Sequence, residues 1–279
     1  MIDLLFCGNI GVFDGVLTCM LSIVRRTRAR EPFTLHLFTM DVSHLDPKYT
    51  PVTDEQADFL DEVLKSYNKN SRVIKYDVTE YYMQYFSGCP NEGAYCSPYT
   101  LIRLFADMIE GIPDKLLYLD TDIMFNRDIL LLWGTDVSRV EYAAANDHYG
   151  KYLINPRYIN AGVILFNMKM CRETGLFAKA REWIQRKKLT FADQSAIIRS
   201  TTKKKLLPQK YNDQKFLHKH TIVRHFSKRL FWLPYPHTDN IKQYHVEKVH
   251  SVFRYHQFDD ILNEYMELKE KFNTRSRDI

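Results

Sequence analysis

The apolar positions at the start of the chain predict a strand, a helix and a second strand. Residues 2–7 form a short apolar run that ends at Gly8-Asn9, which is typical of a buried strand followed by a loop. Over residues 14–28 apolar positions recur at helical spacing, and basic residues gather at the C-terminal end, where the helix dipole favours them. Residues 34–38 form another apolar run. This order indicates a right-handed crossover between parallel strands.

The same alternation continues to about residue 200. We expect helices over 53–67, 99–109, 170–186 and 191–199, and strands over 72–76, 116–119, 142–145 and 162–166. Thr53 should cap the first of these helices, because Gln56 follows three residues later. Residues 81–98 are rich in Tyr, Gly, Pro and Cys, and a connection of this length is usually functional.

Beyond residue 205 the pattern loosens into short apolar pieces broken by prolines. Residues 258–272 predict a last helix docked on the body of the protein, although a partner or a membrane surface could also contact it. No repeat or low-complexity tract marks a domain boundary. We therefore expect one α/β domain over 1–250 and a C-terminal helical segment, 251–279, that packs on it or trails it.

Composition and charge favour an ordinary globular enzyme. The 279 residues are 45% hydrophobic, which is enough for one sizeable core. The net charge of +5 comes from 39 basic and 34 acidic residues, and the longest basic run is only Lys203-Lys204-Lys205. Nucleic-acid binders usually carry a clustered basic stripe, so we expect no nucleic-acid partner.

The cysteines and the apolar segments bear on location. Five cysteines, at positions 7, 19, 89, 96 and 171, form neither an even set nor a close pair, which is typical of a reducing compartment. The N-terminus lacks the basic region of a signal peptide, and no segment reaches the roughly 18 apolar residues that cross a bilayer. We expect a cytoplasmic, bacterial protein that could lie at the inner face of the membrane.

Two carboxylates one residue apart, Asp120 and Asp122, interrupt the apolar run 115–125. An ionised carboxylate in such surroundings is costly unless a cation or hydrogen bonds compensate it, so the pair indicates a metal ion and a phosphate-bearing substrate. Ligands of open α/β sheets gather at the carboxyl ends of strands, which is where these residues fall. Asp122 alone could instead be a turn or capping carboxylate.

Two further stretches place polar side chains beside small residues or at a helix start. Ala161 and Gly162 would let a ligand approach the backbone, and the Asn160 amide can both donate to and accept from sugar hydroxyls. Asp193 and Gln194 begin a predicted helix, where the dipole alone would also favour a carboxylate. Each stretch alone could be a simple turn or helix start.

The order and spacing of these motifs resemble the retaining glycosyltransferases of family 8, the group of glycogenin and the lipopolysaccharide galactosyltransferases, over roughly residues 2–226. The matching stretches are Leu4-Leu5-Phe6-Cys7-Gly8-Asn9, Ser97-Pro98-Tyr99-Thr100-Leu101-Ile102-Arg103-Leu104, Leu117-Tyr118-Leu119-Asp120-Thr121-Asp122, Asn160-Ala161-Gly162-Val163, Asp193-Gln194 and Ile222-Val223-Arg224-His225-Phe226. The resemblance implies a GT-A fold, with a single mixed, mostly parallel sheet flanked by helices and a nucleotide-sugar bound at the carboxyl ends of the strands.

The resemblance also implies a metal site and its chemistry. Asp120, Asp122 and His225 would coordinate a divalent ion, Mn²⁺ or Mg²⁺, that bridges the diphosphate of a UDP-sugar. Two hard carboxylates and one imidazole suit Mn²⁺ better than Zn²⁺ or Ca²⁺. The ion would neutralise the charge that develops on the departing UDP.

The resemblance assigns the remaining site residues. The residues expected to bind the donor are Gly8, Asn9, Arg103, Asp120, Thr121, Asn160, Ala161 and Lys228. Asp193 would orient the sugar, and Gln194 would stabilise oxocarbenium character at the reacting carbon. The retaining reaction would proceed either by double displacement or by front-face attack. Arg103 could instead be a helix-surface arginine. The aromatic run 81–86 could stack on an acceptor sugar or pack as a lid.

The chain departs from the family pattern in two places. Family members commonly place an aspartate where Asn9 stands, although an amide can also pair with a pyrimidine edge. The usual run His-x-x-Gly-x-x-Lys-Pro-Trp is replaced by residues 225–232, which end at Trp232. Lys228 or Arg229 would then supply the positive charge for the β-phosphate. We assign no metal to the other C-terminal histidines, which are His218, His220, His237, His245, His250 and His256.

The expected activity is that of a hexosyltransferase in lipopolysaccharide or polysaccharide biosynthesis. It would move glucose or galactose from a UDP-sugar to a glycan, glycolipid or protein acceptor. One alternative is a sugar-nucleotide nucleotidyltransferase, which needs a Gly-rich phosphate loop that Gly8-Asn9-Ile10-Gly11 does not match. The other is a catalytically silent module that binds a nucleotide-sugar.

Overall fold

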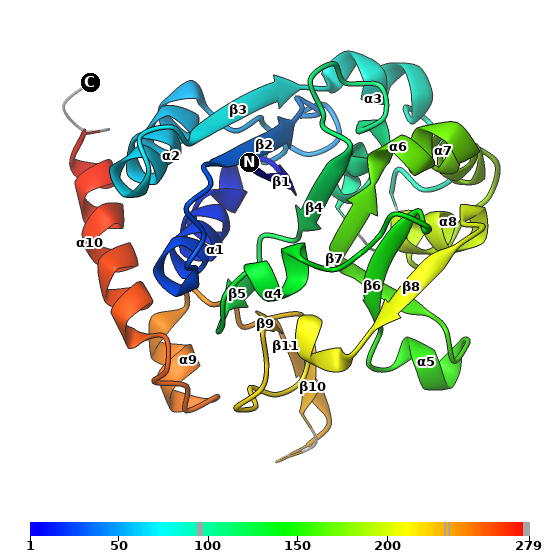
Figure 1. The fold of residues 1–279 in the computed structure, drawn as a ribbon. Helices are drawn as coiled ribbons and strands as arrows, with labels where there is room; N and C mark the ends of the chain where they lie inside the picture. Colours follow the sequence, from blue (N-terminus) through cyan, green and yellow to red (C-terminus); the bar gives the residue numbers. More distant parts are fainter. Residues whose placement is uncertain (94–96, 232, 234, 276–279) are drawn as a thin grey trace.

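A computed structural model describes residues 1–93, 97–231, 233 and 235–275 of the protein. Its centre is a seven-stranded sheet with the strand order β3-β2-β1-β4-β7-β6-β8, flanked by helices (Figure 1). The strands of this sheet are β1 (Ile2–Cys7), β2 (Phe33–Thr39), β3 (Arg72–Asp77), β4 (Lys115–Leu119), β6 (Tyr142–Asn146), β7 (Ile159–Asn167) and β8 (Lys204–Leu207). β1, β2, β3 and β4 run parallel to one another. β7 is antiparallel to both of its neighbours, β4 and β6, and β8 is parallel to β6. The mixed, mostly parallel sheet predicted from the sequence is confirmed.

The helices cover two hydrophobic cores, one on each face of the sheet. The α-helices are α1 (Phe13–Arg26), α2 (Asp54–Tyr67), α3 (Thr79–Tyr85), α4 (Leu130–Trp133), α5 (Gly150–Leu153), α6 (Met168–Thr174), α7 (Leu176–Arg186), α8 (Ala192–Ser200), α9 (Val246–Ser251) and α10 (Asp259–Arg275). In β1, Leu4 and Phe6 join the core under α1 and α2, whereas Leu5 and Cys7 join the core under α6, α7 and α8. Burial on both faces explains why β1 is apolar throughout.

The helix boundaries confirm some predictions and correct two. Thr53 caps α2, and its reciprocal hydrogen bonds with Gln56 form the predicted capping box. Residues 170–186 are helical as predicted but form two helices instead of one, because Gly175 adopts a left-handed φ of 67° and separates α6 from α7. The helix predicted over 99–109 is wrong, since the chain forms two short 3-10 helices, Pro98–Thr100 and Ile102–Phe105. In an α-helix the Leu104 N–H would donate to the Thr100 carbonyl. Here the side chain of Arg103 donates to that carbonyl, and the Leu104 N–H donates to the Leu101 carbonyl.

The segment predicted to be irregular over 81–98 begins within α3. Tyr82 and Phe86 are fully buried, and the Phe86 ring lies 5.0 Å from that of Phe105. Much of the aromatic run therefore packs into the core. Residues 94–96, which include Cys96, lie outside the described part of the chain.

Short strands that periodicity did not reveal complete the lower part of the molecule in Figure 1. They are β5 (Ile123–Phe125), β9 (Val223–His225), β10 (Arg229–Phe231) and β11 (His237–Asp239). The sequence also did not predict β8 of the central sheet. β5 pairs with β9 and β10 pairs with β11, both antiparallel. Three residues are too few to carry a clear alternation of apolar and polar positions. The predicted tryptophan position, Trp232, lies outside the described residues.

The C-terminal helix α10 docks on the body of the protein, as its apolar face predicted. The rings of Phe272 and Phe13 lie 4.4 Å apart, and Arg26 forms a bidentate pair with Asp260 across α1 and α10. Within the described residues, no helix is long and apolar enough to cross a membrane.

Candidate active site

Asp120, Asp122 and His225 meet at the carboxyl end of β4. Asp120 follows β4 directly, and Asp122 precedes β5. Because β5 pairs with β9, His225 lies opposite Ile123 and beside the two carboxylates. One ligand atom from each of the three residues lies within 4.8 Å of the others. The structure thus brings together the three residues that the family resemblance assigned to a metal.

The surroundings of this cluster fit a divalent cation. Asp122 Oδ1 is buried and has no hydrogen-bond partner among the described residues, while His225 Nε2 lies 3.0 Å from it in an ion-pair contact. His225 Nδ1 lies 3.1 Å from Asn212 Oδ1, which holds the ring so that Nε2 faces the carboxylates. Two carboxylates and an oriented imidazole suit Mn²⁺ or Mg²⁺.

Gly162 lets β7 pass directly beside the cluster. A Cβ atom at this position would lie 2.4 Å from His225 Cε1 and 2.7 Å from Asp120 Oδ2, which is closer than any real contact. The Asp120 N–H also donates to the Gly162 carbonyl at 2.8 Å. The glycine of the Asn-Ala-Gly-Val motif is therefore required by the close packing of strand and cluster.

Arg103 is buried and contacts several site residues, so it is not a helix-surface arginine. Its guanidinium pairs with Asp120 at 3.3 Å and with Asp193 at 3.1 Å, and lies 3.7 Å from the centre of the Tyr118 ring. It also donates to the Ala161 carbonyl at 2.6 Å. Burial opposes its charge, but Asp193, Tyr118 and Asp120 outweigh that effect and raise the pKa of Arg103. Arg103 therefore holds other site residues in place.

Asn160, Asp193 and Gln194 form a network between β7 and the start of α8. Gln194 Oε1 accepts from the Ala161 N–H at 2.8 Å. The Asn160 amide donates to Asp147 at 3.0 Å and accepts from the Gly162 N–H. Burial raises the pKa of Asp193, although Arg103 opposes the shift. The structure thus places all three predicted residues around the same corner of β7.

Lys242 is a site residue that the sequence did not reveal. Its Nζ lies 2.5 Å from Asp122 Oδ2, and the neighbouring Gln243 donates to the Thr121 carbonyl at 2.8 Å. Burial lowers the pKa of Lys242, but the Asp122 carboxylate outweighs this and raises it. Burial likewise disfavours the charge of Asp122, yet His225 and Lys242 lower the pKa of Asp122. The family pattern places its lysine six residues after the histidine, whereas Lys242 lies 17 residues after His225, so the motif did not indicate it.

A cavity of about 290 Å³ opens beside these residues. Its lining includes Gly8, Asn9, Thr121 and Lys242, whereas Lys228 and Arg229 are not part of it. The Asn9 amide donates to the Lys48 carbonyl at 3.0 Å and accepts from the Gly11 N–H, so it shapes the loop at the cavity edge. Of the predicted donor-binding residues, Gly8, Asn9, Asp120 and Thr121 line this cavity, whereas Arg103, Asn160, Ala161 and Lys228 do not.

Known proteins with similar sequences are glycosyltransferases. The model of the family described as Glycosyl transferase family 8 matches residues 4–228. The chain is 26% identical over 204 residues to glycosyltransferase GlyA of Streptococcus pneumoniae, an alignment that covers 70% of this chain and 25% of that protein. The chain therefore spans about a quarter of the length of this curated relative.

Solved structures share the fold over nearly the whole chain. The apo structure of the bifunctional glycosyltransferase WbbM has a TM-score of 0.70 at 18% identity, over 96% of this chain and 51% of that chain. The galactosyltransferase LgtC, solved with donor and acceptor sugar analogues, has a TM-score of 0.68 at 17% identity, over 94% and 96% of the two chains. At these identities the likeness shows the fold, and the predicted GT-A fold is confirmed.

Proposed function

The chain belongs to glycosyl transferase family 8, and on that premise we propose that it is a metal-dependent, retaining hexosyltransferase with a UDP-sugar donor. The observation that supports this most is the convergence of Asp120, Asp122 and His225 beside a cavity at the carboxyl end of β4. This is the position at which open α/β sheets bind their ligands.

The proposed metal site would hold Mn²⁺ or Mg²⁺ through Asp120, Asp122 and His225. Bound there, the ion would act as a Lewis acid toward the diphosphate of the leaving UDP. Arg103 keeps Asp120 in position from one side, and Asn212 keeps His225 in position from the other. Because these side chains are already ordered, they would lose little conformational entropy when the ion binds.

Lys242 is proposed as the cation for the diphosphate, in place of Lys228. Its ammonium group already lies in the cavity, where it balances Asp122. A metal ion bound by Asp122 would release this ammonium group from its ion pair, so that it could bind a phosphate oxygen. A lysine serves this role as a compact point charge.

The donor sugar is proposed to lie against Asn160, Asp193 and Gln194. Asp193 is fixed by Arg103 at 3.1 Å and Gln194 by the Ala161 N–H at 2.8 Å. Dipoles fixed in this way can stabilise charge that develops at the anomeric carbon. The donor would be UDP-glucose or UDP-galactose, and the acceptor a glycan, glycolipid or protein.

Calorimetry with UDP, with and without Mn²⁺, tests the proposal. We expect UDP to bind when Mn²⁺ or Mg²⁺ is present, and slow hydrolysis of one UDP-hexose in a screen of UDP-sugars. A folded protein that binds no UDP with either ion would overturn the proposal. Release of pyrophosphate from UTP and a sugar phosphate would indicate a nucleotidyltransferase instead. UDP-sugar binding with no hydrolysis or transfer of any donor would indicate a silent binding module.

A further inference from the structure

Two protrusions carry the most exposed large hydrophobic side chains of the described residues. Leu153 and Tyr152 on α5 are 80% and 77% exposed, and Leu233 and Tyr235 between β10 and β11 are 83% and 67% exposed. Single exposed apolar residues are common on soluble proteins and need no explanation. Four such residues concentrated on two projecting tips indicate a surface that contacts something apolar.

Both protrusions are attached to the candidate active site. Asp147 accepts from the Gly150 N–H of α5 at 2.7 Å with one oxygen, and from the Asn160 amide with the other. The β10–β11 hairpin follows β9, whose last residue is His225. α5 and the hairpin both project from the lower edge of the molecule in Figure 1.

One loop links the two protrusions. Gln214 accepts from the His148 N–H, just before α5, at 2.8 Å. Two residues later in the same loop, the Phe216 ring lies 5.3 Å from the guanidinium of Arg229 on β10. The two tips therefore border one face, next to the proposed donor site.

The charged residues within both tips have one sign, although Asp147 and Asp239 flank them. Residues 148–158 and 226–238 contain lysine and arginine but no aspartate or glutamate. A groove of about 1030 Å³ also begins at Ile154 and continues past Arg157 to Lys187, Lys188 and Lys204, and none of the described residues that line it is acidic. Apolar tips next to cations complement a surface that is apolar inside and anionic outside.

We propose that α5 and the β10–β11 hairpin dock the protein on an anionic lipid surface, with Leu153 and Leu233 inserted at the level of the headgroups. The two leucines offer a glycan chain neither an aromatic face nor a hydrogen bond, and the two tyrosines suit the level of the lipid headgroups, where one end of the ring is apolar and the other is wet. Together they favour lipid over a glycan chain. If the proposed transferase function holds, this orientation turns the donor site toward the membrane and makes a lipid-linked acceptor the expected substrate class.

Vesicle sedimentation tests the docking surface. The full chain should sediment with vesicles of phosphatidylcholine and phosphatidylglycerol, bind pure phosphatidylcholine more weakly, and dissociate at high salt. The double variant Leu153→Glu/Leu233→Glu should lose at least ~10-fold in binding, because two apolar side chains no longer insert. The matched control is Leu131→Glu, at an exposed leucine of α4, which should bind like the wild type.

Three outcomes would overturn the docking proposal. They are an absence of wild-type binding to any vesicle, equal binding by the double variant, and a wild-type dimer that the double variant converts to a monomer without any vesicle binding. Calorimetry of UDP with Mn²⁺ in the absence of vesicles is expected to be the same for the double variant and the wild type. Failure of that binding in the wild type would concern the proposed function and not the docking surface.

Discussion

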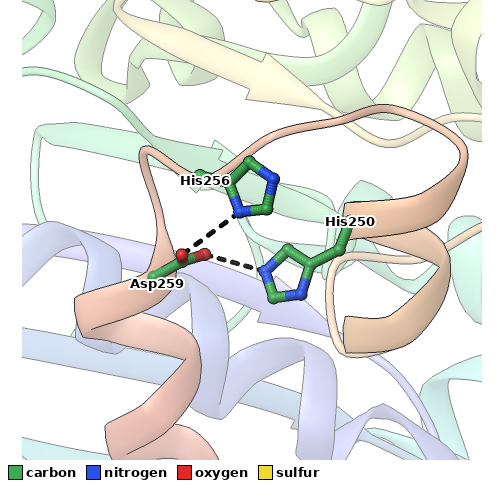
Figure 2. A group of neighbouring side chains, drawn as sticks. All are labelled: His250, His256 and Asp259. Carbon is green, nitrogen blue, oxygen red and sulfur yellow. Dashed lines mark hydrogen bonds and ion pairs between the residues drawn. The ribbon is translucent and has the colours of Figure 1, made fainter.

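Two groups of aspartate and histidine side chains differ in their burial. In the first, which we call the buried group, the side chains of His225 and Asp122 are 4% and 15% exposed, whereas in the second, the exposed group, those of His256 and Asp259 are 66% and 41% exposed. Asp120, Asp122 and His225 lie at the floor of the candidate active site, and His250, His256 and Asp259 lie at the junction of α9 and α10 (Figure 2). In each group the potential ligand atoms lie within 4.8 Å of one another. Proximity and residue type alone therefore do not separate them.

The difference lies in the burial of each carboxylate and in the geometry of its contacts. In the exposed group His250 contacts one oxygen of Asp259 at 2.7 Å and His256 contacts the other at 3.3 Å, as Figure 2 shows. Asp259 also opens α10, where the helix dipole favours a carboxylate. In the buried group His225 Nε2 lies 3.0 Å from Asp122 Oδ1 and Lys242 Nζ lies 2.5 Å from Asp122 Oδ2, but Oδ1 is buried and accepts no well-aligned hydrogen bond from the described residues. A cation would stabilise a buried oxygen in this state.

The largest expected effect comes from removing one carboxylate of each group. Asp122→Asn should lower the affinity for UDP in the presence of Mn²⁺ at least ~100-fold, because the buried site loses a charged ligand. Asp259→Asn is the matched control and should stay within about twofold of the wild type. Calorimetry measures both, and circular dichroism checks that both fold. Equal losses in the two variants would break the distinction between the groups.

A smaller effect is expected from filling the space beside the buried group. Gly162→Ala introduces a methyl group that must displace His225 or Asp120, so Mn²⁺ affinity should fall about 10-fold. Overpacking should also lower the free energy of unfolding by about 1–3 kcal/mol. Gly93→Ala is the control, since a Cβ there meets no atom of the described residues within 4 Å. Titration with Mn²⁺ and urea unfolding provide the two measurements, and unchanged Mn²⁺ affinity would contradict the close approach.

Lys242 sharpens the comparison because only the buried group carries a lysine on its carboxylate. Lys242→Met should raise the affinity for Mn²⁺ alone, on the order of 10-fold, because the ion no longer competes with an ammonium group for Asp122. The same variant should bind UDP more weakly when Mn²⁺ is saturating. Lys228→Met is the control for the alternative phosphate lysine. Weaker UDP binding in that variant alone would assign the role to Lys228.

The smallest effect is expected at the exposed group. Asp259→Ala should lower the free energy of unfolding by about 0.5–1 kcal/mol, through loss of a carboxylate at the start of α10. UDP binding should not change. Thermal and urea unfolding test the first statement. A destabilisation as large as that of Gly162→Ala would mean that the junction of α9 and α10 does more than begin a helix.

The sequence predicted six of the seven strands of the central sheet, all except β8, because their signals are local. β1 and β2 are continuous apolar runs bounded by polar loops, and burial on both faces produces such runs. The capping box of α2 needs only Thr53 and Gln56, three residues apart. Both features can be recognised without knowing what packs against them.

The sequence did not predict features that depend on contacts between distant residues. Lys242 reaches Asp122 only because the segment after β11 returns to the carboxyl end of β4, where Gln243 fixes it to Thr121. The 3-10 helices around Arg103 likewise accompany ion pairs of its side chain with Asp120 and Asp193, which are distant in sequence. Intrinsic helix propensity carries no information about such pairings.

The pairing of β5 with β9 has a consequence for folding kinetics. It joins Ile123 to His225 across the intervening α5, β7 and α8, so the chain must close a long loop before the imidazole can reach the two aspartates. Contacts between residues far apart in sequence form late and slowly. Before this pairing forms, Asp120 and Asp122 would lack their third ligand. Tight Mn²⁺ binding during refolding would therefore report the formation of the β5–β9 pair.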